Sequence, residues 1–193
     1  MEAPLDLLRR QVYAVHPVDE AAWQALSGVW TEISVKRKQL LTSTGETEKY
    51  LYLVLEGVQR AFFQDETHEA TLVFSYAPSF SGVIDSFFLQ QPSRVYLETL
   101  TASRLLRVHY NDLFSLMEEF RSVETWVRLA LTQTLAGTLQ RQVELMSFTA
   151  EEKFRTLLHR SPHVLQLIPH KYLASYIGVD PATFSKLLGT VRL

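Results

Sequence analysis

The sequence contains no cysteine, and this absence excludes several kinds of site. Without thiols the chain can form no disulfide, no cysteine-ligated zinc site, no cysteine-held iron–sulfur cluster and no thiolate nucleophile. No apolar run reaches about 18 residues, so we expect no membrane-spanning helix. The N-terminus, where Arg9 and Arg10 soon appear, lacks the apolar stretch of a signal peptide. We therefore expect a cytoplasmic protein without a resident cofactor.

An excess of charge of one sign is also missing, since the formal net charge is −2. This balance gives no general attraction to nucleic acid or to a membrane, so a DNA-binding surface must be local. Residues 148–193 carry six basic and three acidic side chains, a modest local excess.

The motifs of common enzymes and metal sites are absent as well. The chain has no Walker loop, no dinucleotide-binding glycine pattern and no Gly-x-Ser-x-Gly elbow. His159 and His163 lie four residues apart, but Pro162 interrupts their helix and no third ligand is close in sequence. Only His68 and His109 lie in the strand region, too few for a cupin-type metal enzyme. We predict neither an enzyme nor a metal site.

Turn residues divide the middle of the chain into short apolar runs. A helical lead-in comes first, with Asp19 as the predicted N-cap of a helix that begins at Glu20. From Ile33 to about Tyr110 the runs are separated by Gly, Pro, Asp and Ser at irregular intervals, and Gly57 marks one such turn. This spacing predicts a β-sandwich or barrel.

A helical pattern follows, with apolar residues at alternating steps of three and four. The residues on this seam are Leu129, Thr132, Ala136, Leu139, Val143 and Met146. The seam indicates a dimerisation helix, although it spans under three heptads and Thr132 and Ala136 are weak members. The alternative is a helix that only packs on the sheets.

A new helix is predicted to begin at Ala150, because Thr149 and Glu152 form a capping box. It should end near Arg160, since Pro162 disfavours helical geometry in the residue before it. We therefore expect two domains, residues 1–147 and residues 148–193.

The most specific pattern lies near the end of the chain. Gly178 is a predicted C-cap, and Asp180 is a predicted N-cap followed by proline at the first helical position. Two short helices joined by such a turn, with the small Ala174 where they would cross, match a helix-turn-helix. The second helix would enter the major groove of DNA. The DNA-binding candidates are Ala182, Thr183, Ser185 and Lys186 on that helix, with His170 and Lys171 for phosphates.

Taken in order, the motifs resemble the Crp/Fnr family of transcription regulators, in particular its shorter members. The matching segments are residues 50–58, 86–93, 97–103, 149–154 and 173–185. The resemblance implies an α+β fold: a double-stranded β-roll of the cyclic-nucleotide-binding type (a jelly roll) with flanking helices, a long dimerisation helix and a C-terminal helix-turn-helix. It also implies a homodimer that binds DNA and a roll able to sense a small-molecule effector.

The chain departs from the family in the segment that binds cyclic nucleotides. Family members carry a glutamate that accepts the ribose hydroxyl, where this chain has Val83, and an arginine for the phosphate, for which Arg94 is a candidate. An unpartnered buried hydroxyl would cost about 1–3 kcal/mol, so we do not expect cyclic AMP to bind. Two alternatives remain: the roll binds an unknown effector, or its pocket is filled. In the second case Arg94 is a solvated strand-edge residue and Gly82 is a turn glycine that contacts no ligand. The pocket candidates are Gly82, Val83, Ile84, Asp85, Ser93 and Arg94.

The DNA-binding end also departs from the family. The first two positions of the second helix are Pro181 and Ala182, which leaves Lys186 as its only long polar side chain. The alternative function is therefore a sensor or interaction protein whose helix-turn-helix no longer binds DNA.

Overall fold

The computed structural model describes residues 2–191, and the chain divides into two compact units. The first unit comprises Met1–Ala61 and Phe74–Gln133, and the second comprises Phe62–Val73 and Thr134–Leu193. The chain therefore passes between the units at three places, after residues 61, 73 and 133. No described helix is both long and apolar enough to cross a membrane.

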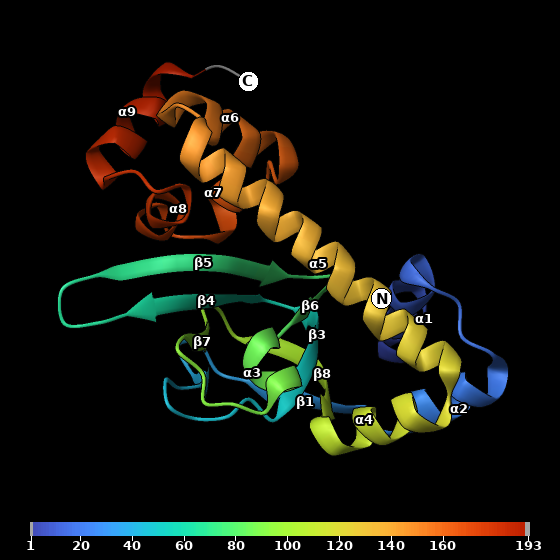
Figure 1. Cartoon of the computed structure of the whole chain (residues 1–193). Helices are drawn as coiled ribbons and strands as arrows, with labels where there is room; N and C mark the ends of the chain where they lie inside the picture. The colour runs from blue at the N-terminus through green and yellow to red at the C-terminus, as the bar shows by residue number, and fades with distance from the viewer. Residues whose placement is uncertain (1, 192–193) are drawn as a thin grey trace. The chain divides into compact units, whose positions relative to one another are not determined.

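Helices precede, interrupt and follow a run of short strands (Figure 1). The strands are β1 (Thr31–Val35), β2 (Leu40–Thr42), β3 (Tyr50–Glu56), β4 (Val58–Gln64), β5 (Glu69–Tyr76), β6 (Ser79–Ser81), β7 (Tyr96–Thr99) and β8 (Ser103–His109). The helices are α1 (Pro4–Val15), α2 (Glu20–Gly28), α3 (Ile84–Leu89), α4 (Tyr110–Glu119), α5 (Arg121–Ser147), α6 (Ala150–Arg160), α7 (Val164–Leu167), α8 (His170–Ile177) and α9 (Pro181–Thr190).

The strands form two four-stranded sheets, with orders β1-β8-β3-β6 and β2-β7-β4-β5. Strand β8 pairs antiparallel with both β1 and β3, and β3 pairs antiparallel with β6. In the second sheet β2 pairs antiparallel with β7. The predicted α+β fold with a β-roll is confirmed.

Strand β3 shows how the sequence distributes its side chains between two apolar clusters. Leu51 and Leu53 are buried in a cluster that includes residues of the flanking helices, such as Trp126. Tyr52 and Val54 alternate with them and belong to a second cluster, which residues of both sheets share. This alternation is expected because successive side chains of a strand point to opposite faces.

The turn between β3 and β4 requires a glycine. Gly57 has a φ of +92°, which an L side chain rarely adopts. A Cβ at this position would also overlap the side chain of Ser103 and the carbonyl of Ala102. The sequence therefore marks this turn correctly.

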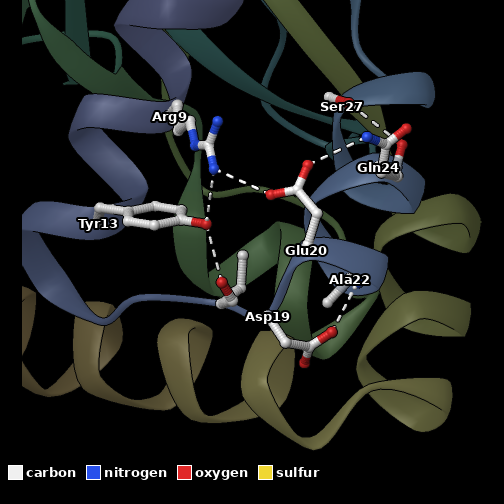
Figure 2. A network of polar contacts seen from close by, with 8 residues as sticks. Arg9, Tyr13, Asp19, Glu20, Ala22, Gln24 and Ser27 are labelled. Carbon is white, nitrogen blue, oxygen red and sulfur yellow. Dashed lines mark hydrogen bonds and ion pairs between the residues drawn. The ribbon is translucent and has the colours of Figure 1, made fainter.

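The N-terminal helices are held by local polar contacts (Figure 2). The Asp19 carboxylate accepts a hydrogen bond from the amide of Ala22 at 2.9 Å, which confirms it as the N-cap of α2. Arg9 of α1 lies 3.1 Å from the carboxylate of Glu20 and contacts the ring of Tyr13. These contacts connect the start of α2 to α1.

The second unit contains the C-terminal half of α5 and helices α6 to α9. Helix α6 spans Ala150–Arg160, as predicted, and both hydrogen bonds of the capping box between Thr149 and Glu152 are present. Phe154 of α6 packs edge-on against Phe184 of α9, with ring centroids 5.3 Å apart. The unit thus has an apolar core of its own.

Candidate DNA-binding site and effector pocket

A tight turn joins α8 and α9. Gly178 adopts the left-handed conformation at the C-cap of α8, and the amide of Val179 donates to the carbonyl of Ala174 at 3.1 Å. The Asp180 carboxylate accepts hydrogen bonds from the amide of Thr183 at 2.9 Å and from its hydroxyl at 2.6 Å. The hydroxyl and the amide of Thr183 hold the pKa of Asp180 below its usual value. The two predicted caps are confirmed.

The inner faces of α8 and α9 are apolar and buried. Leu173, Ala174 and Ile177 of α8 and Phe184 and Leu187 of α9 are at most 9% exposed. Burial of this face turns the opposite face of α9 toward solvent. The local arrangement is that of a helix-turn-helix.

The six candidate DNA-binding residues lie at the starts of α8 and α9. On α9, the side chains of Ala182, Ser185 and Lys186 are exposed, while Thr183 is half-buried and its hydroxyl bonds to the capping aspartate. His170 and Lys171 are exposed on the first turn of α8. The Lys171 ammonium lies 4.7 Å from the ring centroid of Tyr172. The exposed face of α8 and α9 presents hydroxyl groups and two lysines, and its only carboxylate among these described helices is that of the N-cap Asp180.

Contacts between residues far apart in the sequence fix these helices to α5. The Arg141 guanidinium lies 3.9 Å from the ring centroid of Tyr176 and donates to its backbone carbonyl. Glu144 is 2% exposed, and its carboxylate lies 2.5 Å from Nη2 of Arg160. Burial alone would raise the pKa of Glu144, but the bonds from Arg160 and the nearby Arg141 outweigh it and lower the value. No sequence signal reveals pairs that are 16 and 35 residues apart.

The end of the β4–β5 hairpin contacts α8 within the second unit. The hydroxyl of Ser175 accepts a hydrogen bond from the amide of Thr71 at 2.9 Å. It also lies 3.4 Å from the carbonyl of Glu69, to which it can donate. A residue of the predicted helix-turn-helix is therefore tied to a strand more than a hundred positions away in sequence.

The predicted seam lies on α5. Leu129 is half-buried, whereas Thr132 and Ala136 are exposed. Leu139, Val143 and Met146 are 53%, 52% and 79% exposed, and Leu135, which the prediction did not include, is 59% exposed. These large apolar side chains have no cover within the described residues.

The six pocket candidates lie around α3 and before β7. Val83 is buried at the N-cap of α3, and Gly82 before it has a φ of +146°. Asp85 is exposed and Ile84 is half-buried. The buried hydroxyl of Ser93 donates to the carbonyl of residue 95 at 2.6 Å. Arg94 is exposed and forms no ion pair with another described residue.

A carboxylate that sequence analysis missed lies beside these residues. Glu48 is 2% exposed and accepts hydrogen bonds from the amide of Val83 at 3.3 Å, the hydroxyl of Thr42 at 2.5 Å and the amide of Tyr50 at 3.2 Å. Burial raises the pKa of Glu48 above its usual value. The amide of Val83 therefore already donates its hydrogen bond to Glu48. No three potential metal ligands lie together in the described residues.

Comparisons with known proteins reveal the fold. Neither the models of protein families nor the curated proteins give a match. Among solved structures, FixK2 from Bradyrhizobium japonicum superposes with a TM-score of 0.74 at 16% identity, over 83% of each chain.

Two further structures agree with this result. A Crp/Fnr-family transcriptional regulator from Eubacterium rectale gives a TM-score of 0.70 at 15% identity over 89% of this chain and 82% of that one. The c-di-GMP responsive global regulator CLP from Xanthomonas campestris gives 0.65 at 17% identity over 89% and 90%. The chain therefore has the cyclic-nucleotide-binding-like fold of the Crp/Fnr transcription regulators.

Proposed function

We propose that the chain is a dimeric one-component transcription regulator that binds DNA through α8 and α9, within a DNA-binding domain of residues 148–193. The observation that carries this proposal is the two-faced α9, with Phe184 and Leu187 buried and Ser185 and Lys186 exposed after a tight turn. A helix of this kind presents its outer residues to base edges in the major groove. The fold shared with FixK2 and CLP supports the same function.

The test is selection of genomic fragments with the purified protein, followed by titration of the enriched sequence at several salt concentrations. An inverted repeat with half-sites about one helical turn apart is expected. Lys186→Ala should weaken binding and reduce the salt slope by about one. Lys36→Ala is the matched control, because it removes an exposed lysine from the turn after β1. Equal losses in both variants would contradict a role for Lys186 in the contact.

The proposed dimer interface is the exposed apolar face of α5. Leu135, Leu139, Val143 and Met146 follow at steps of four, four and three, so they share one face of the helix. A second copy that contributes the same face would cover them. Leu139→Asp should therefore convert a dimer into a monomer in sedimentation velocity. Gln133→Asp, about 120° around the helix, should leave the dimer intact.

The roll is proposed to respond to a small effector other than cyclic AMP or cyclic GMP. The carboxyl group of Glu48 already accepts the hydrogen bond of the Val83 amide, so this amide is not free to bind a cyclic nucleotide. Titration calorimetry with cyclic AMP and cyclic GMP should give no heat of binding. Micromolar affinity for either would refute this part of the proposal.

A sensor or interaction protein without DNA binding is the second candidate. It is favoured by the sparse outer face of α9, where the hydroxyl of Thr183 is used by Asp180 and Ala182 offers no polar group. Failure of the selection to enrich any sequence, with and without a metabolite extract, would support it.

A further inference from the structure

Three arginines lie on strands of the first unit, and their surroundings differ. Arg60 is 2% exposed and pairs with Glu98 at 2.7 Å, and Arg104 pairs with Glu32 at 2.8 Å. Arg107 forms no ion pair with any described residue. Its guanidinium lies 4.3 Å from the ring centroid of Tyr50, and its buried Nε has no hydrogen-bond partner there. A buried N–H without a partner costs free energy, so a ligand that offers an acceptor to this group would be stabilised.

Arg107 lines a cavity of about 350 Å³. The walls are formed by Ile33, Ser34, Val35, Gln39, Leu40, Leu41, Tyr50, Tyr52 and Arg107. The lining side chains are apolar or aromatic except for Ser34, Gln39 and Arg107, and polar atoms supply about half of the exposed lining. Small-molecule sites likewise combine apolar walls with a few placed polar groups. The volume is at the low end for such sites, about 300–1,000 Å³. The lining residues Val35 and Tyr52 belong to the same apolar cluster as Val83, in the interior of the roll.

A second polar group of the cavity also lacks a partner. Tyr52 is 3% exposed, and its hydroxyl forms no hydrogen bond with a described residue. It lies directly opposite Arg107 in the pairing of β3 with β8. Burial, with a smaller effect from Glu48, raises the pKa of Tyr52, so the hydroxyl stays protonated and can donate. Two adjacent donors therefore line the same cavity.

We propose that this cavity binds a small organic monocarboxylate with a flat apolar body. The fork of Arg107 would hold the carboxylate, the hydroxyl of Tyr52 would donate a further hydrogen bond, and the apolar body would lie against Ile33 and Leu41. A single negative charge is favoured because Arg107 is the one cation among the lining residues. This inference rests on the proposed function, in which the roll responds to an effector, and it names a chemical class for that effector.

The test is titration calorimetry of the free full-length protein with three probes: benzoate, the neutral benzamide and the dianionic phenyl phosphate. Benzoate should bind at millimolar concentrations or better, and more tightly than the other two. Arg107→Gln should weaken benzoate binding by at least about tenfold, because a charged hydrogen-bonded pair is lost. Tyr52→Phe, which keeps the packed ring, should weaken it by about threefold to tenfold. Arg121→Gln removes an 84%-exposed cation and is the matched control.

The outcomes separate clearly. Equal binding of benzoate and benzamide, tighter binding of phenyl phosphate, or no binding of benzoate at about 10 mM would each overturn the proposal. So would loss of binding in Arg94→Gln but not in Arg107→Gln, because the anion would then lie elsewhere. If Arg107→Gln lowers the melting temperature strongly, Tyr52→Phe decides the question. DNA is absent from this assay, so its result is independent of the fragment selection.

Discussion

Replacement of Glu144 by glutamine tests how the second unit is held together. The Glu144 side chain is 3% exposed and binds the side chain of Arg160, which is 51% exposed, while the side chain of Arg141 lies 3.8 Å away and is 14% exposed. Removal of one partner of a fully buried pair costs about 3–5 kcal/mol. Because half of the Arg160 side chain remains hydrated, we expect a smaller loss of about 1–3 kcal/mol in the free energy of unfolding.

The assay uses the placement of the tryptophans. All three tryptophans of the sequence, Trp23, Trp30 and Trp126, belong to the first unit. Their fluorescence therefore follows the first unit, whereas far-ultraviolet circular dichroism follows the helices of both units. In urea, Glu144→Gln should lower the midpoint of the dichroism transition by about 1 M and change the fluorescence transition less.

A control and a pH series complete the test. Glu151→Gln removes an exposed pair with Arg155 and should cost under about 1 kcal/mol. The pKa of Glu144 is lowered by folding, so its contribution is present above its ordinary value of 4.5 and is lost as the pH falls through the lower folded value. An unchanged dichroism midpoint, or equal shifts in both variants, would refute the conclusion that the pairing of Glu144 with Arg160 stabilises the second unit.

Three further predictions concern single residues. The pKa of Glu48 is raised by folding, so its contribution to stability should be lost as the pH rises from the ordinary value of 4.5 through the higher folded value. Glu48→Gln should remove this dependence in fluorescence-monitored unfolding, and a flat wild-type profile would contradict it. Gly178→Ala should cost about 1–2 kcal/mol because of its φ of +66°, although the new Cβ would lie at an ordinary 3.5 Å from Leu145; an unchanged dichroism midpoint would show that the turn relaxes. Thr149→Ala should cost about 1 kcal/mol by loss of the bond to the amide of Glu152, and a neutral result in the same assay would mean that water replaces it.

Features that depend on neighbouring residues were predictable from the sequence. The caps at Asp19, Thr149 and Asp180 and the turn at Gly178 each use groups within four positions, and all four are present. Local hydrogen-bond chemistry decides such features before any tertiary contact forms. The change from strands to helices near Tyr110 also followed from local signals.

Groups that act on distant residues were not predictable. In the sequence Glu48 is one of two glutamates in a polar segment, yet in the structure its carboxyl group accepts a hydrogen bond from the amide of Val83. Arg107 reads as an ordinary strand arginine, and only the pairing of β8 with β3 reveals its stacking on Tyr50. Periodicity in a sequence reports which face of an element is apolar, but it does not report which side chain of another element lies opposite.

The composition of the second unit bears on how the protein can be cut into parts. The unit draws Phe62–Val73 from the middle of the chain and also uses α5 from Thr134 onward. A recombinant fragment that began at residue 148 would lack Arg141 and Glu144 and the strand that binds Ser175. No single truncation point therefore releases this unit complete, and a single protease cut at the hairpin end would yield two fragments without a covalent link, each carrying part of both units.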